Sequence, residues 1–311
     1  MTTRGKSRPV SRRSRTTRGI GVGRVLVGTD LSLDGDRAVR RVATLPLTSR
    51  ASVVVASVLP RKIDPATDSV VRGAAETELE TTAAKLASTL EERGRTDVIV
   101  TTRLVRGDPA EELLRLAAVL EADLVVVGRR GQSRMKEILI GTTARRMVRR
   151  GRQPVLVVGP PPTAPYRRAL VGYDLSAEAK RAAQMMRRIT PATARLAAVA
   201  AFDDPLAGVP AALMPSGARA RRQRAGEALR ERARAVRRAL EPAGIEGLIL
   251  KTGDPRSVLL EQARVKKADL LAVGSSGKSR LGRLFLGSVA EAVVERAPCD
   301  VLVTRRRGMA Y

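Results

Sequence analysis

The sequence predicts an α/β protein made of two tandem, doubly wound parallel sheets of five strands each, a Rossmann-like arrangement. Three observations support this fold class. The chain has 311 residues, which is long enough for two domains that each bury a core. One set of motifs occurs twice in the same order, with Gly128 and Gly274 as corresponding positions. Short Val/Leu/Ile runs alternate with segments of helical periodicity, which is typical of parallel strands covered on both faces.

The first copy predicts nine elements in order. Strands are expected near 24–29, 52–58, 97–104, 123–128 and 154–158, and helices near 35–44, 70–93, 109–120 and 142–150. Each helix follows a strand, so the crossovers are expected to be right-handed and to cover both faces of the sheet. Ligands of such sheets bind beyond the carboxyl ends of the strands.

The second copy repeats the landmarks of the first. Val25-Leu-Val-Gly-Thr-Asp-Leu-Ser32 matches Ala169-Leu-Val-Gly-Tyr-Asp-Leu-Ser176, and Gly-Asp-Pro occurs at 107–109 and at 253–255. A proline-rich stretch separates the copies. We therefore predict a basic tail at 1–23, a first domain at 24–159, a linker at 160–167, a second domain at 168–305 and a short tail at 306–311.

The composition excludes several classes of function. The chain has no histidine, so Ser-His-Asp catalysis and histidine metal sites are absent from it. The one cysteine, Cys299, excludes an internal disulfide and is expected to be a small buried thiol. No apolar run approaches the ~20 residues of a membrane span, and no apolar segment follows the basic N-terminus as in a secretory signal. These features favour a cytoplasmic protein without a membrane span.

The net charge of +27 is unevenly distributed. Residues 1–23 hold seven Lys/Arg and no acid, and residues 219–238 hold nine Arg against Glu227 and Glu231. This pattern indicates either a solvated arginine-rich surface or contact with a polyanion such as DNA or RNA. Aromatic residues make up only 2% of the chain, which argues against specific recognition of single strands.

A glycine pattern marks a candidate phosphate site in each half. It reads Gly128-x2-Gly131-x9-Gly141-Thr142 in the first half and Gly274-x2-Gly277-x9-Gly287-Ser288 in the second. Each copy follows an apolar run that ends at Val127 or Val273. Glycines let backbone N–H groups close on a phosphate, and the hydroxyl is expected to cap the helix that follows.

An aspartate follows the first strand of each copy, at Asp30 and Asp174. A carboxylate at this position can hold a hydrated Mg²⁺. It can also form a turn or a cap for the next helix, and both interpretations stay open.

Together, these motifs resemble the universal stress protein family, over roughly 24–158 and 168–304. The resemblance implies an ATP-binding fold with strand order 3-2-1-4-5 and a regulatory role linked to stress. It implies that Asp30 and Asp174 lie near the ribose-phosphate and Mg²⁺, and that Val58, with Ala201 as its counterpart, offers backbone contacts to adenine. The motif glycines, Thr142 and Ser288 are then expected to surround the phosphates.

The two copies differ at the candidate sites. The residue before the aspartate is Thr29 in the first half and the bulky Tyr173 in the second, and the loop carries Arg129-Arg130 in place of Ser275-Ser276. Arg129 favours phosphate binding electrostatically, although it could equally be one more exposed arginine. The two sites are therefore expected to differ in affinity, with the Tyr173 half as the suspected weaker one.

The favoured function is an ATP-binding regulator with a nucleotide site in each half and no fast turnover. The alternatives are a polyanion-binding protein and a slow ATP hydrolase or phosphotransferase. The last strands, Val155–Val158 and Val301–Val303, are expected to be exposed edges that pair the two halves as an internal pseudo-dimer. Pairing of these strands between two chains, as a homodimer, is the competing arrangement.

Overall fold

The computed structural model describes residues 20–129, 140–202, 218–275 and 286–305 and contains an alternation of strands and helices in both halves. The first half contains β1 (Val22–Gly28), α1 (Leu33–Val42), β2 (Leu47–Leu59), α2 (Asp68–Glu92), β3 (Ile99–Arg106), α3 (Pro109–Val119), β4 (Leu124–Gly128), α4 (Thr142–Arg150) and β5 (Val155–Val158). The second half contains β6 (Arg168–Gly172), α5 (Ala177–Ile189), β7 (Arg195–Phe202), α6 (Ala218–Leu240), β8 (Gly247–Thr252), α7 (Pro255–Val265), β9 (Leu270–Gly274), α8 (Ser288–Arg296) and β10 (Asp300–Thr304).

The predicted elements of the first half are found within a few residues of their expected bounds, with one larger difference in β2. This strand begins at Leu47, which pairs with Val22 of β1 ahead of an irregularity in the register. The polar run Thr48-Ser49-Arg50 indicates a turn in the sequence, although it belongs to the strand. The predicted tails at 1–19 and 306–311 lie outside the described residues.

The ten strands of the described residues form one sheet in the order β3-β2-β1-β4-β5-β10-β9-β6-β7-β8. Each half therefore has the expected order 3-2-1-4-5, and its internal pairs are parallel. The halves join where β5 and β10 run antiparallel, with Leu156 opposite Leu302. The predicted fold class and the pairing of the two halves through their last strands are confirmed.

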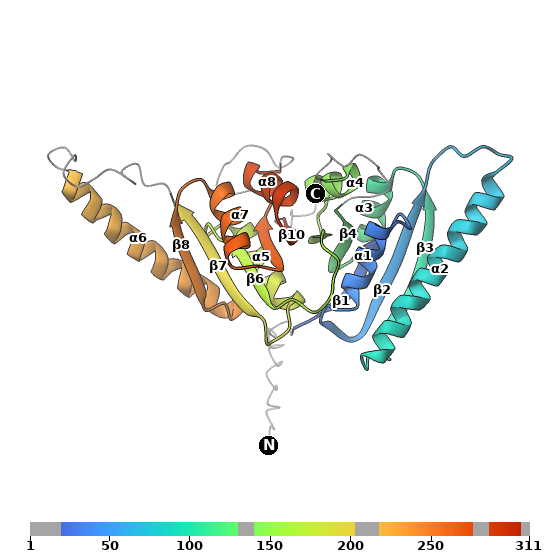
Figure 1. The fold of residues 1–311 in the computed structure, drawn as a ribbon, viewed down its shortest axis with the longest axis horizontal. Coiled ribbons are helices and arrows are strands. Elements are labelled where there is room, and N and C mark those ends of the chain that lie inside the picture. The colour runs from blue at the N-terminus through green and yellow to red at the C-terminus, as the bar shows by residue number, and fades with distance from the viewer. Residues whose placement is uncertain (1–19, 130–139, 203–217, 276–285, 306–311) are drawn as a thin grey trace, which may run out of the picture.

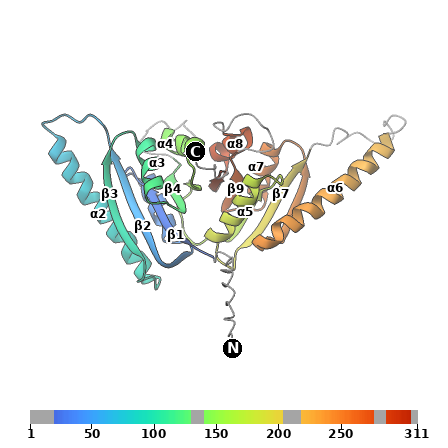
Figure 2. The same ribbon diagram turned by 180° about the vertical axis from the view of Figure 1, so that it is seen from behind.

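Helices cover both faces of the sheet, and each layer encloses one apolar core. Buried residues of α1, α2, α5 and α6 pack on one face, and those of α3, α4, α7 and α8 pack on the other. Both cores include residues from the two halves, so they continue across the β5–β10 junction. Figures 1 and 2 show α2 and α6 along the two outer flanks, with α4 and α8 near the centre.

A buried polar cluster connects the two halves. The Asp300 carboxylate of β10 lies 2.8 Å from the Arg41 Nε of α1, and the exposed fractions of the two side chains are 1% and 6%. The carboxylate also accepts the Tyr166 hydroxyl at 2.7 Å and the Gly159 N–H at 3.0 Å. The Arg41 guanidinium lies 4.3 Å from the centre of the Tyr166 ring. Pro154 occupies the position equivalent to Asp300 in the first half, so the cluster has no symmetric copy.

Cys299 is buried beside this cluster, as the sequence predicts. Burial, reinforced by the Asp300 carboxylate, raises the pKa of the thiol to about 12. Since the thiolate is the reactive form, we expect iodoacetamide at pH 8 to label the folded chain at least ~100-fold more slowly than the chain in guanidinium. Mass spectrometry measures both rates without ambiguity, because the chain has one cysteine. Equal rates would contradict this environment.

Candidate functional site

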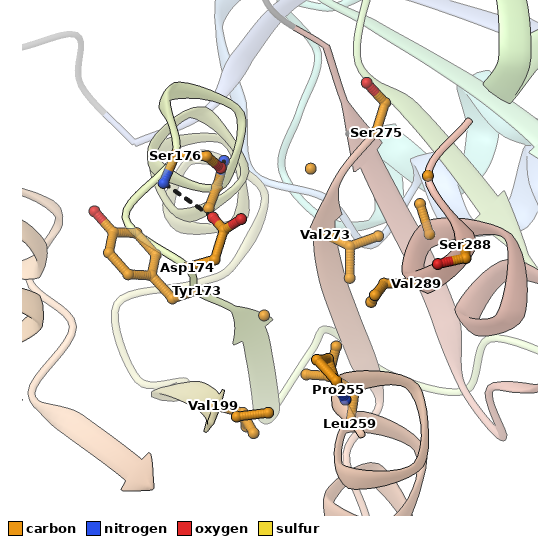
Figure 3. A pocket seen from close by; sticks show the side chains of 16 residues that line it. Tyr173, Asp174, Ser176, Val199, Pro255, Leu259, Val273, Ser275, Ser288 and Val289 are labelled. Carbon is orange, nitrogen blue, oxygen red and sulfur yellow. Dashed lines mark hydrogen bonds between the residues drawn. The ribbon is translucent and has the colours of Figure 1, made fainter. Parts of the chain in front are cut away.

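A cavity of about 280 Å³ lies in the second half, at the carboxyl ends of β6 and β9 and at the start of α8. These strands are neighbours in the sheet, yet their connections cross to opposite faces. This is the point at which doubly wound sheets hold their ligands. Figure 3 shows Asp174 and Ser176 on one side of the cavity and Ser288 and Val289 on the other.

The turn after β6 fixes the Asp174 carboxylate at the rim. Asp174 Oδ1 accepts the N–H of Ser176 at 2.9 Å, and Ser176 Oγ in turn accepts the N–H of Ala179 at 3.1 Å to cap α5. Between them, Leu175 adopts φ 69°, a left-handed conformation that costs a non-glycine residue about 1 kcal/mol. The aspartate therefore shapes the turn, as one interpretation expected, and also lines the cavity.

The glycine motif supplies the opposite rim. The Ser275 N–H donates to Thr304 of β10 at 2.8 Å, and the Gly287 N–H donates to the Ser275 carbonyl at 2.7 Å. These bonds close the base of the loop, whose middle glycine, Gly277, lies outside the described residues. A side chain at Gly274 would place its Cβ 2.7 Å from the Glu178 Cβ, so only glycine fits this approach of β9 to α5.

The helices that begin at the two glycine motifs lack the cap that was predicted for them. Gly141 and Gly287 themselves are the N-cap residues of α4 and α8, and neither helix receives a hydrogen bond from a capping side chain. Thr142 and Ser288 are instead the first helical residues, so the prediction that their hydroxyls cap these helices is wrong. Among the neighbouring helices, α1, α3, α5 and α7 all carry side-chain caps. An uncapped first turn presents N–H groups that suit an anion.

The cavity floor is apolar. It is formed by Val199 and Ala201 of β7, Leu259 of α7 and Val273 of β9. A Cβ at Gly172 would lie 3.0 Å from Leu259 Cδ1, so the glycine leaves room for this leucine at the floor. The strand register also settles the counterpart of Val58. Gly28 pairs with Ala56 and Gly172 with Val199, which places Ala201 at the position of Val58, as expected.

Tyr173 lies beside the cavity, as the sequence indicates, but it does not fill it. Its side chain is part of the buried core, with 4% exposure, and in Figure 3 its ring extends away from Ser288 and Val289. Burial and the neighbouring Asp174 carboxylate raise the pKa of the Tyr173 phenol.

The first half repeats this local geometry. Asp30 Oδ1 accepts the N–H and the hydroxyl of Ser32, at 3.2 and 2.5 Å, and Ser32 caps α1. Leu31, like Leu175, has a left-handed φ of 59°. The Gly141 N–H donates to the Arg129 carbonyl at 2.7 Å, which closes the base of the loop. Val127 is buried and Thr142 is exposed, while Gly131 lies outside the described residues.

Arg129 has a different position from the one predicted. Its guanidinium crosses to the second half and donates to the carbonyls of Ala297 at 2.7 Å and Cys299 at 2.5 Å. It also packs against Gly159, where an added Cβ would lie 2.7 Å from the guanidinium carbon. This side chain therefore joins the halves, and we leave it out of the phosphate site.

Val58 lines a second, more open cleft, together with Arg61, Asp108 and Glu111. Ion pairs cross beside it. Arg146 of α4 lies 2.5 Å from Asp108 and 3.2 Å from Glu111, and Arg61 lies 3.4 Å from Glu111. The positions equivalent to Arg146 and Glu111 in the second half are Ala292 and Ser257, which cannot form such pairs.

Pro255 and Leu259 of α7 also line the cavity, and neither was predicted from the sequence. The repeated Gly-Asp-Pro motif was the available signal. Asp108 and Asp254 cap α3 and α7, so the motif fixes the start of the helix that carries the floor leucine.

The sequence pattern of the universal stress protein family matches residues 21–159 and again residues 165–305. The chain belongs to the universal stress protein family. It is a tandem member, with one matched region in each half.

One relative and two solved structures illustrate what the chain is similar to. A universal stress protein of Thermus aquaticus is 35% identical over 141 residues, which is 45% of this chain and 99% of that protein. A universal stress protein structure from Archaeoglobus fulgidus has the same fold over 92% of this chain and 98% of its own, at 21% identity and a TM-score of 0.66. A universal stress protein solved in complex with cAMP is 28% identical and aligns with 45% of this chain and 98% of its own, at a TM-score of 0.32.

Two further observations concern membrane spans and metal sites. No described helix of this universal stress protein is long and apolar enough to cross a membrane. Within the described ranges, no group of three or more acidic or cysteine side chains could hold a metal ion. Asp30 and Asp174 each offer a single carboxylate, a donor set that suits Mg²⁺ only when a phosphate ligand supplies further oxygens.

Proposed function

We propose that the second half binds an adenine nucleotide, principally ATP with Mg²⁺, and that the protein is a nucleotide-responsive regulator with little or no turnover. The observation that carries this proposal is the composition of the cavity. An apolar floor, an uncapped helix N-terminus and a fixed carboxylate meet in one space of about 280 Å³. That volume is near the lower end of the range for small-molecule pockets, so we expect the nucleoside inside and the phosphates at the rim.

Each part of the ligand has a matching part of the site. The adenine ring would lie on the apolar floor near Val199 and Ala201, where burial of its faces is favourable. The phosphates would accept N–H groups at the start of α8, around Gly287 and Ser288. Asp174 would face the ribose or hold Mg²⁺ through its water shell while the phosphates complete the coordination.

The lining favours binding over catalysis. Tyr173 and Asp174 are the ionisable side chains among the cavity residues, and the raised pKa of Tyr173 keeps its phenol protonated. The chain has no histidine to serve as a base near neutral pH. A regulator that changes with bound nucleotide therefore fits better than a hydrolase or phosphotransferase.

We propose a weaker site of the same kind in the first half, formed by Asp30, Gly128, Gly141 and Thr142. Arg129 is held by carbonyls of the other half, and ion pairs tie α4 to α3 beside Val58. Breaking these contacts to admit a ligand would cost free energy and so weaken binding in the first half.

A cytoplasmic location fits an ATP-responsive regulator and stays a prediction. The predicted domain boundaries also stay predictions.

Calorimetric titration of the full chain with Mg-ATP, Mg-ADP, AMP, cAMP, adenosine and Mg-GTP tests the proposal. We expect one tight binding event for Mg-ATP, at least ~10-fold tighter than for adenosine, because each charge-assisted phosphate contact contributes about 1.5–3 kcal/mol. We also expect cAMP to compete with Mg-ATP. Equal affinity for ATP and adenosine would show that the N-terminus of α8 does not bind the phosphates. If no adenine compound bound, the proposal would be overturned.

A further inference from the structure

The two outer flanks of the molecule carry opposite charge. α2 and α6 hold equivalent places in the two halves, one along each flank (Figure 1). The α2 segment contains six acidic residues and two basic ones, a net charge of −4. The α6 segment contains nine arginines and two glutamates, a net charge of +7. A general arginine bias of the chain does not account for this difference, because both helices belong to the same repeated unit.

Four arginines of α6 form an exposed ridge, with Glu227 and Glu231 beside it. Arg230, Arg234, Arg237 and Arg238 are exposed and lie at helical positions i, i+4, i+7 and i+8, which share one face. Val236 and Leu240, on the other face, are buried in the core. Within the described part of the chain, none of the four arginines forms an ion pair, whereas Arg106 of β3 pairs with Asp68 of α2 on the opposite flank. The positive charge of the ridge is therefore available to an external anion.

We propose that this basic ridge (Arg230, Arg234, Arg237 and Arg238) binds the phosphate backbone of duplex nucleic acid without reading its sequence. From Arg230 to Arg238 the ridge spans about 12 Å along the helix axis, which corresponds to three to four phosphates of one strand at ~3.4 Å each. Arginines along such a helix can contact successive phosphates. The described part of the helix carries no aromatic side chain for base stacking, so single strands are a poorer match.

Two other occupants fit the ridge less well. Helices that lie on membranes insert an apolar face between lipids, but Val236 and Leu240 of α6 are buried in the core of the protein. A second copy of the chain could bring its acidic α2 to the ridge, but each copy carries a net charge of +27 and repels the other. The proposal is independent of the nucleotide site, which lies at the carboxyl ends of β6 and β9.

The test compares two variants of the full chain, so that residues 1–19 contribute equally to both. The ridge variant carries Arg230→Gln, Arg234→Gln, Arg237→Gln and Arg238→Gln. The control variant removes the same charge from exposed positions of the first half, by Lys62→Gln, Lys85→Gln, Arg103→Gln and Arg152→Gln. Fluorescence anisotropy measures binding to a labelled 30-base-pair DNA duplex between 50 and 200 mM salt, and thermal unfolding confirms that both variants fold.

We expect the ridge variant to bind at least ~10-fold more weakly than the natural chain, and the control to stay within ~3-fold. The slope of log K against log salt should become shallower by about 3.6 for the ridge variant, since each of the four phosphate contacts contributes about 0.9 to it. Equal losses in the two variants would overturn the proposal, because net charge alone would then explain binding. The proposal would also be overturned if the ridge variant bound DNA as tightly as the natural chain. In that case, a loss of binding to phosphatidylserine vesicles would assign the ridge to a membrane surface, and a loss of self-association in sedimentation would assign it to a second copy of the chain.

Discussion

Replacing Asp300 with alanine is expected to lower the free energy of unfolding by about 3 to 5 kcal/mol, because the change removes one partner of a buried ion pair. The Arg41 guanidinium would stay buried without its counter-charge. The Tyr166 hydroxyl and the Gly159 N–H would also lose their acceptor. Since Asp300 lies on β10 and Arg41 on α1, the loss falls at the junction of the two halves. Urea unfolding of the two chains measures the difference.

Two controls make this result specific. Glu295→Ala breaks another contact between the halves, the 2.9 Å pair with Arg145, but those side chains are 24% and 43% exposed, so the expected cost is below about 1 kcal/mol. The double variant Arg41→Met with Asp300→Leu removes both charges together and should recover the part of the loss that comes from the unpaired Arg41 charge, while the Tyr166 hydroxyl and the Gly159 N–H still lack their acceptor. A single variant as stable as the Glu295→Ala control would contradict the buried cluster.

The same cluster predicts a pH dependence of stability. Burial raises the pKa of Asp300 above its ordinary value of 3.8, against the opposing attraction of Arg41. The folded chain therefore takes up this proton at a higher pH than the unfolded chain. The stability contributed by Asp300 protonation is fully present below pH ~3.8 and is lost as the pH rises through the folded pKa. The double variant should lack this slope.

The fold could be predicted from the sequence because its signals are local and occur twice. Alternating Val/Leu runs and helical segments fixed the element order, and the apolar last strands indicated how the halves meet. The early start of β2 could not be predicted in this way. Its Thr48-Ser49-Arg50 run is polar, and only the pairing of Leu47 with Val22 makes it part of a strand.

The candidate site could be predicted in outline. Asp174, Val273, Gly274, Gly287 and Ser288 come from separate stretches of the chain and line one cavity. The position of Arg129 could not be predicted, because its partners Ala297 and Cys299 belong to the other half. The Asp300 cluster could not be predicted for the same reason, because Arg41 and Tyr166 are far from Asp300 in the sequence. Aligning the two halves shows that Pro154 in the first corresponds to Asp300 in the second. The alignment does not indicate which residues Asp300 contacts.

If the second-half cavity holds the nucleotide, a pair of matched substitutions in the two halves should have very different effects on binding. Ala201→Phe places a ring over the apolar floor of that cavity, whereas Val58→Phe makes the equivalent change in the first half. We predict that Ala201→Phe weakens the tight Mg-ATP binding event by ~100-fold or more, which corresponds to about 2.7 kcal/mol. Val58→Phe should change it by less than ~3-fold. If Ala201→Phe folds normally and binds Mg-ATP as tightly as the natural chain, the nucleotide does not occupy this cavity.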